Sequence, residues 1–358
     1  ADAAYNAANE KLHSRTGKQP YTGSADCIWS IPIDDLAFEP NIGDEVSTPT
    51  EGGFFIVDYL KTAGAWGGGG AGDTATIWLR KPGDATCGMA GAEVLTNVTQ
   101  ANIIGNTTAG PTGRSVTISA SRTLAGNIGA GWGIFSIWPL SAVQLLFYTE
   151  YAGADSQTLV GRGIVDKVGG TGFNGEVSGF NTADTNIGVN GSGAGTGANG
   201  LTPIAYRGIE NLWGNIWQFI DGYDAVDGDV GATDVKYRLI KRDGTGAFAN
   251  PMAAGNYEES LNLTNPVGPA DGYIRNIAYG ELLKFVFFAS DCGGSSSTYL
   301  YDYWGGHDAA EVNILLAGGT WHYAVLAGVG FRYSNNVAAN TNRNNGTQLE
   351  LRTGAALN

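Results

Sequence analysis

Cysteine is scarce in this chain, and the three cysteines that occur lie far apart. Cys27, Cys87 and Cys292 form no CxxC pair and no cluster with histidine. This spacing indicates neither a zinc site nor a dense disulfide framework, and the odd number leaves at least one thiol free. Histidine is equally scarce, with only three residues in the chain. We therefore predict no metal site and no cofactor.

Clustered positive charge and long apolar runs are also lacking. The 20 Lys and Arg residues are scattered and are outnumbered by 34 Asp and Glu, which gives a formal net charge of -14. Such a chain offers no basic face to a phosphate backbone, so we expect no nucleic-acid partner. The best apolar run, Leu282 to Ala289, has the length of one strand, so we expect no membrane insertion.

Glycine, in contrast, is abundant. The 56 glycines and the low charged content of 15% are typical of a turn-rich chain, which favours an all-β or α+β fold over a helical bundle. A length of 358 residues suits two domains with a sizeable core. The character of the sequence changes near Pro111, so we predict a small β-rich domain over residues 1–110 and a second domain over residues 111–358.

The N-terminal third is predicted to contain strands. Residues 1–25 are polar and are expected to form a short helix or an arm. The stretch from Trp66 to Asp73 lacks the GK[ST] ending of a phosphate loop and is interpreted as a hairpin loop. Runs rich in Ile, Val, Phe and Trp stand between Gly, Pro and Asp clusters, as strands do: CIWSIPI, GGFFIVDYL, ATIWLR and AEVLTNV.

Two helices are predicted after Pro111. The first spans Ser119 to Asn127. The second spans Leu140 to Ala152, with Pro139 in its first turn and Gly153 just past its end. One face of the second helix is expected to be buried, along a stripe of Val143, Leu146, Phe147 and Glu150 that Leu145 widens.

The middle of the chain is expected to alternate between loops and core. Residues 188–200 are of low complexity and are interpreted as a surface loop. Residues 202–228 contain Trp213 and Trp217 and are expected to form a tightly packed core segment. Residues 237–241 are expected to form a strand, and residues 282–288 a buried element.

Four aspartates follow this core segment within nine residues. Carboxylates at such density suit a hard cation such as Ca²⁺, but their spacing is not that of an EF-hand loop. Solvated turn residues are the alternative interpretation. The four are Asp221, Asp224, Asp227 and Asp229.

The last sixty or so residues combine Tyr and Trp with Gly, Ser, Ala and Asn. Tyr and Trp offer rigid contact area, and small polar residues supply adaptable hydrogen bonds, so this mixture is typical of a recognition surface. The alternative interpretation is the core of a terminal β-meander. Two of the three histidines, His307 and His322, fall in this segment.

Three segments, taken in order, resemble one family. They are GAGWGIFSIWPLSAVQLLFYTEY, then YRGIENLWGNIWQFIDG, then GGSSSTYLYDYW followed by LAGGTWHYAVLAGVGFR. They resemble the C-type lectin fold shared by formylglycine-generating-enzyme-like domains and the variable proteins of diversity-generating retroelements. The likeness spans residues 112–351 and rests on a helix-strand-helix order, an EN-x-x-GN-x-W motif from Glu210 to Trp217 and a C-terminal GG-x-W. It implies an α+β, C-type lectin-like second domain.

The family contains enzymes and binding proteins. Formylglycine-generating enzymes use a pair of late cysteines, and this chain has only Cys292 in that region. The three histidines stand in no recognised catalytic setting. We therefore predict a protein that is not an enzyme and has no catalytic residues. A related oxidase and a virion structural protein are the alternatives.

The binding branch is similar to phage tropism determinants. This resemblance implies host attachment through a protein or glycan receptor, on a virion surface, as in a tail fibre, or on a cell surface. It also implies a possible homo-oligomer, a trimer by analogy, with residues 1–110 serving attachment or oligomerisation. In such proteins a C-terminal segment, here about residues 298–351, is rewritten by adenine-directed mutagenesis.

The resemblance divides this segment into fixed and variable positions. If Trp321 lies in a strand, Thr320 and His322 point to the opposite face. The end of the chain, GTQLELR, departs from the G-x-R-L of the family, which leaves the register of the last strand open. The expected scaffold is Trp213, Trp217, Ser295 to Thr298, Asp302, Gly318, Gly319, Trp321, Gly328 and Arg332. The expected ligand-binding residues are Tyr303, Gly305, Gly306, His307, Thr320, His322, Tyr323, Val325, Val329 and Tyr333.

Overall fold

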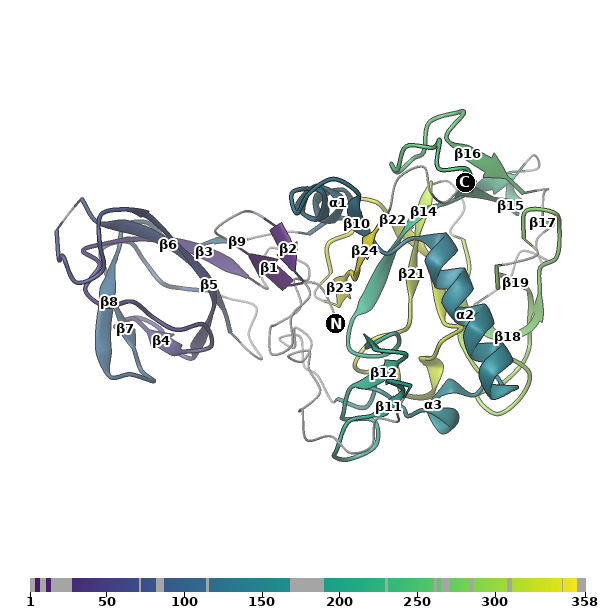
Figure 1. Cartoon of the computed structure of the whole chain (residues 1–358), viewed down its shortest axis with the longest axis horizontal. Coiled ribbons are helices and arrows are strands. Elements are labelled where there is room, and N and C mark those ends of the chain that lie inside the picture. The colour runs from purple at the N-terminus through teal and green to yellow at the C-terminus, as the bar shows by residue number, and fades with distance from the viewer. Residues whose placement is uncertain are drawn as a thin grey trace.

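The protein is mostly β-sheet with few helices (Figure 1). A barrel from the N-terminal third lies beside a larger body of sheet and helices (Figure 1). In the part of the chain described here, no helix is both long and apolar enough to cross a membrane. The computed structural model describes residues 4–6, 11–13, 28–70, 72–81, 87–113, 116–167, 190–228, 231–260, 263–264, 271–283, 286–307, 311–342 and 344–352.

Six antiparallel strands close into the barrel. They pair in the ring β3-β6-β5-β4-β7-β8-β3, and β9 (Thr112–Gly113) adds to the start of β3. Alternate side chains such as Ile31, Ile33 and Ile77 fill the interior. The six are β3 (Trp29–Asp34), β4 (Glu45–Ser47), β5 (Phe54–Ala63), β6 (Thr74–Arg80), β7 (Val94–Asn97) and β8 (Asn102–Thr107).

The four strands predicted in this region are confirmed as β3, β5, β6 and β7. The predicted hairpin loop is also confirmed, since β5 and β6 pair on either side of it. Asp73 holds this loop, because its Oδ1 accepts from the Ala65 amide at 2.9 Å. Of the short helix or arm expected over residues 1–25, the helix is wrong for the described residues, because β1 (Ala4–Asn6) and β2 (Lys11–His13) pair as antiparallel strands.

An apolar cluster joins the barrel to the rest of the chain. Ile28, Val57 and Trp78 belong to the same buried cluster as Val116 and Ile118, which begin the second half of the fold. The barrel is therefore packed onto the larger body by buried side chains as well as connected to it by the chain.

The larger body is organised on a ten-stranded sheet. Its path runs β16-β15-β14-β21-β22-β20-β18-β19, with β17 beside β15 and β23 beside β14. The strand expected at residues 237–241 is confirmed within β15. The strands are β14 (Trp217–Gly228), β15 (Gly231–Ile240), β16 (Tyr257–Glu259), β17 (Leu263–Thr264), β18 (Gly272–Ile277), β19 (Ala289–Cys292), β20 (Tyr303–Gly305), β21 (Asn313–Ala317), β22 (Arg332–Val337) and β23 (Asn345–Gly346).

Different helices pack on the two faces of this sheet. Ile220 and Leu315 lie in the cluster that packs under α2 (Ile137–Tyr151), which crosses the sheet in Figure 1. Phe219 and Leu316 lie in the cluster on the opposite side, with side chains from α1 (Ile118–Gly126). The buried element expected at residues 282–288 is confirmed by Leu283, Val286 and Phe288.

Both predicted helices are confirmed, but the buried face of α2 is not the expected one. Leu145 and Leu146 are 45% and 41% exposed, whereas Gln144 is fully buried. The cause is a hydrogen bond: the Gln144 side chain accepts from the buried Arg332, so the face of α2 that carries Gln144 turns toward the sheet. The buried residues of α2 are Ile137, Leu140, Ser141, Gln144 and Phe147.

Short pairs complete the body. β10 (Trp132–Ile134) pairs with β24 (Leu349–Leu351), which settles the register of the last strand. The four-residue α3 (Ser156–Leu159) follows α2. The loop predicted at residues 188–200 is wrong in part, because its described residues include β11 (Gly193–Ala194), which pairs with β12 (Ile204–Tyr206); β12 in turn pairs with β13 (Ile209–Glu210).

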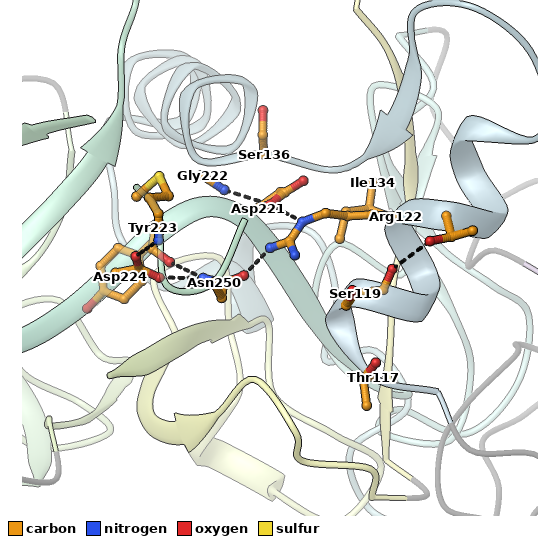
Figure 2. Close-up of polar contacts among 12 residues, drawn as sticks. Thr117, Ser119, Arg122, Ile134, Ser136, Asp221, Gly222, Tyr223, Asp224 and Asn250 are labelled. Atoms are coloured by element: carbon orange, nitrogen blue, oxygen red, sulfur yellow. Dashed lines mark hydrogen bonds and ion pairs between the residues drawn. The ribbon is translucent and has the colours of Figure 1, made fainter. Parts of the chain in front are cut away.

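Three of the four aspartates predicted as a cluster, Asp221, Asp224 and Asp227, lie on β14. Arg122 donates to Asp221 and to Asn250, and Asn250 donates in turn to Asp224, so these two carboxylates are joined through side chains from other elements (Figure 2). Asp221 is fully buried and accepts from Arg122 Nε at 2.8 Å and from Arg352 Nη2 at 3.1 Å. Asp224 accepts from the Met252 amide at 2.6 Å. Within the described ranges no three His, Cys, Asp or Glu side chains gather as metal ligands do, and Asp229 lies outside those ranges.

Asp221 therefore links Arg122 of α1 to Arg352, the residue after β24, through two ion pairs. Asp221→Asn is expected to destabilise the protein by roughly 3 kcal/mol, the lower end of the range for breaking a buried pair, because Arg122 loses its carboxylate partner and Arg352 keeps only Glu350. Chemical unfolding followed by circular dichroism measures this. The exposed Asp243→Asn is the control, and equal effects of the two substitutions would contradict the assignment.

Burial raises the pKa of Asp224 to about 6. The folded state therefore holds this proton more tightly than the unfolded chain, whose aspartates titrate near 3.9. The resulting stabilisation is complete below about pH 4 and is lost as the pH rises through about 6. Asp224→Asn removes this contribution, so the difference in free energy of unfolding between wild type and variant is expected to change across that window. If the free energies of unfolding of wild type and variant change with pH in the same way, the prediction is wrong.

Candidate functional site

Aromatic rings form a row on the face of the sheet opposite α2. The Trp217 and Tyr333 rings stack with centroids 5.1 Å apart, and Phe331 and Tyr303 continue the row at 6.4 and 6.5 Å steps. Tyr323 meets Trp217 edge-on at 5.1 Å. Each such pair contributes about 0.5–1.5 kcal/mol beyond the area it buries, so the row is rigid. Its tyrosines stay partly exposed.

The segment between β21 and β22, residues 318–330, is named here the contact loop. It begins with Gly318 and Gly319, whose φ values are +85° and +80°. A Cβ on Gly318 would lie 2.7 Å from the Leu212 carbonyl oxygen, and one on Gly319 would lie 2.6 Å from Ala327 Cβ. Both positions therefore require glycine, for backbone and for space.

The contact loop is not a strand, so the predicted alternation around Trp321 is wrong. The paired glycines reverse the chain, and a 3-10 turn, η2 (Ala324–Leu326), follows. Thr320 is fully buried and its hydroxyl donates to the Asn215 carbonyl at 3.1 Å. Thr320 and Trp321 thus both point inward, and only His322 of this trio is exposed.

Main-chain hydrogen bonds from other segments hold the first half of the contact loop. The Trp321 amide donates to the Asn215 carbonyl at 2.9 Å. The Lys167 amide donates to the Trp321 carbonyl at 2.8 Å, and the Ala324 amide donates to the Val165 carbonyl at 2.9 Å. The backbone path is therefore fixed without help from the exposed side chains of the loop.

Side chains from α3 hold the second half. Gln157 Nε2 donates to the carbonyls of Ala324 and Ala327 at 2.8 and 2.6 Å. The Val329 amide donates to Ser156 Oγ at 3.1 Å. These contacts also use only backbone atoms of the loop.

The exposed side chains of the loop do not help to hold its backbone in place. Among the interactions of the described residues, neither the His322 ring nor the Tyr323 hydroxyl makes a hydrogen bond, and Val325 is 48% exposed. Burial lowers the pKa of His322, so its imidazole is neutral at neutral pH, and burial raises the pKa of Tyr323. The loop therefore presents uncharged aromatic and apolar surface.

Several other predicted ligand-binding residues lie elsewhere. Gly305 is buried because the Tyr333 ring covers it; a Cβ there would lie 2.1 Å from Tyr333 Cδ2. Gly306 and Val329 are also buried. The His307 ring is held at both nitrogens, by Asn313 Oδ1 at 2.6 Å and Asp227 Oδ1 at 3.2 Å. Apolar packing and internal hydrogen bonds, which the sequence pattern does not display, account for these corrections.

The exposed members of the predicted set converge. They come from β20, the contact loop and the start of β22. Ring contacts link the three tyrosines and the histidine through Phe331 and Trp217, and Val325 follows them in the contact loop. We name this surface the contact face, consisting of Tyr303, His322, Tyr323, Val325 and Tyr333.

The predicted scaffold residues lie beneath this surface. Arg332 is fully buried, and its Nη1 donates to the Phe331 carbonyl at 3.2 Å while its Nη2 donates to Gln144 Oε1. Burial lowers its pKa to about 10, so it remains charged at neutral pH. Asp302 Oδ2 accepts from the Gly330 amide at 2.6 Å, and burial raises the pKa of this carboxyl. Trp213 and Trp321 are buried as expected.

Little in the sequence pattern indicated the residues that anchor the loop. Gln144 and Gln157 are single polar residues in helices and match no motif. Asn215 lies in the EN-x-x-GN-x-W segment, whose left-handed φ of +64° at this asparagine turns its carbonyl toward the loop. A chain of asparagine amides that leads to the Tyr333 hydroxyl was also missed; it consists of Asn345, Asn340, Asn336 and Asn335.

Cys292, the late cysteine, is a free and partly buried thiol. Burial raises its pKa to about 12, so it is uncharged at neutral pH. Because the thiolate is the nucleophilic form, this environment makes Cys292 unreactive.

Gly319→Ala is expected to destabilise the fold by about 1–3 kcal/mol more than Gly244→Ala, because only the former overpacks a neighbour. Gly244 is a matched control: it also has a positive φ, of +74°, but nothing lies within 4 Å of a Cβ there. Thermal and chemical unfolding of both variants provide the comparison. Equal losses would show that backbone strain, and not the contact with Ala327, fixes glycine at this position.

Comparison of the chain with protein-family models and with curated proteins finds no match. The geometry of the contact face therefore carries the functional argument.

Proposed function

We propose that this protein is a non-enzymatic ligand- or receptor-binding protein that displays a variable surface on a C-type lectin-like scaffold. The contact face is the recognition surface. Its target is a protein or glycan on another surface, and the protein itself acts at the surface of a virion or cell.

One observation carries this proposal. The contact loop is held by hydrogen bonds between its backbone and residues outside it. His322 and Val325 are exposed and Tyr323 is half-buried against Trp217, and none of these three side chains makes a hydrogen bond to the described residues. Side chains that take no part in holding the backbone can be exchanged at little cost in stability. A protein whose contact residues are rewritten needs this separation of scaffold and surface.

The fold supports the resemblance on which the proposal rests. α1, β10 and α2 follow one another in the helix-strand-helix order of the family. The EN-x-x-GN-x-W segment runs from β13 into β14, and its Trp213 and Trp217 pack on the two sides of the sheet. β10 and β24 bring the two ends of the lectin-like region together.

Recognition would rest on a few rigid aromatic anchors surrounded by small residues. Each contact face is small, so individual affinities are modest, and several copies acting together would supply the binding strength. In this proposal the barrel serves attachment or oligomerisation, with a trimer by analogy to tail-fibre display.

Sequencing of the gene and its neighbourhood tests the proposal. We expect a reverse transcriptase gene and a near-copy of the 3′ coding segment that differs mainly at adenines. Across a population, substitutions should fall at His322, Tyr323, Val325 and Tyr333 and should spare Trp321. Invariance at these codons, or the lack of both neighbouring elements, would refute the retroelement origin.

Two further measurements separate the alternatives. Turnover of a cysteine-containing peptide in the presence of Cu or Ca²⁺ would favour the oxidase. A loss of particle assembly, measured by mass, on joint substitution of His322, Tyr323 and Tyr333 by Ala would favour a structural protein. The binding proposal predicts neither outcome.

A further inference from the structure

A cavity of about 450 Å³ opens beside the contact face. Its walls come from α3 and the residues after it, from Asn199, from the turn at Ser296 to Asp302, and from the contact loop through Val325 and Ala327. This volume falls in the lower part of the range of about 300–1,000 Å³ for small-molecule sites. A ligand the size of a mono- or disaccharide fits such a space.

The lining is rich in groups that donate and accept hydrogen bonds. Within the described part of the chain, the Tyr301 hydroxyl and Asn199 Nδ2 make no hydrogen bond, so both are free to meet a ligand. Asp155 keeps one oxygen on the Thr158 amide, at 3.0 Å, and offers the other. Hydroxyl, amide and carboxylate together match a ligand that both donates and accepts at several points.

The backbone holds Tyr301 in an uncommon conformation. Its φ is +63°, in the left-handed region that costs a bulky residue about 1–2 kcal/mol. The strain is stored where the side chain lines the cavity, as is frequent at binding sites. The Tyr301 ring and Val325 give the cavity its apolar contact, which suits the C–H face of a sugar ring.

The charges of the lining do not favour a charged ligand. The Arg162 guanidinium already has partners within the protein: its Nη2 donates to Asp166 Oδ1 at 2.9 Å, and its Nε donates to Gln157 Oε1 at 3.1 Å. Asp302, at the floor, is buried and accepts from the Gly330 amide. An anionic ligand would meet the carboxylate of Asp155, while Arg162, the cation of the lining, is already paired with Asp166. A large apolar ligand would remove water from the polar walls without replacing its hydrogen bonds.

We propose that this cavity binds a neutral sugar residue, held by Asn199, Asp155 and the Tyr301 hydroxyl, at the edge of the contact face. The inference deepens the proposed function and rests on it, because Val325 belongs to both surfaces. It assigns a glycan, and not a bare peptide, as the part of the target that enters the cavity.

Saturation-transfer NMR with the full chain tests this proposal. The probes are the methyl glycosides of glucose, galactose, mannose and N-acetylglucosamine, each at millimolar concentration, as weak single-ring binding requires. We expect transfer to at least one of them, unchanged by EDTA. Lack of transfer to all four, or its loss on addition of EDTA, would overturn the proposal.

Two substitutions then locate the site. Tyr301→Phe and Asn199→Ala are each expected to weaken binding about threefold to tenfold, the effect of one lost hydrogen bond. Tyr299→Phe is the matched control, because Tyr299 lies in the same turn with a φ of +61° but does not line the cavity. Equal affinities for the Tyr301 and Tyr299 variants, with unfolding curves like that of wild type, would place the sugar elsewhere and contradict the proposal.

The two proposals fail separately. If codons of the contact face vary in the population but no sugar binds, the recognition function stands and the sugar cavity is wrong. If a sugar binds in the cavity but the codons are invariant, the variable-surface origin is wrong.

Discussion

The structure depends on a buried arginine. Arg332 lies at the start of β22 with no exposed surface, between the Gln144 side chain of α2 and the carboxyl of Asp302. A charge in this position is tolerated only when polar groups surround it, so α2, β22 and the end of the contact loop must all be in place together. This requirement sets the face that α2 buries, and it holds the neighbouring residue, Tyr333, on the opposite face of the sheet.

The alternation of the strands around Arg332 separates scaffold from surface. Arg332 and Trp304 point under α2, whereas Tyr333 and Tyr303 join the aromatic row. One residue step along a strand thus changes a side chain from a structural element to a contact element. In the contact loop the same separation is reached differently, because the two glycines and the backbone hydrogen bonds replace the alternation.

This difference explains how much was predictable from the sequence. The barrel strands, both helices and the burial of Trp213 and Trp321 followed from runs of apolar residues, from helix boundaries and from the resemblance. The burial of Thr320 and the inward turn of Gln144 did not, because each depends on one hydrogen bond to a residue distant in the sequence. The partners of Asp221 and Asp224 were missed for the same reason: density along the chain indicates a cluster, but on β14 each carboxylate meets a different element.

The anchoring of the contact loop has a consequence for the kinetics of binding. Because Asn215, Gln157 and Ser156 already fix the backbone of the loop, a target of the proposed kind would meet it in its final conformation, and little conformational entropy would be lost on association. Variants that differ only at exposed positions would share this preorganised backbone and so associate at similar rates. Their affinities for a common target would then differ mainly in how fast the complexes dissociate.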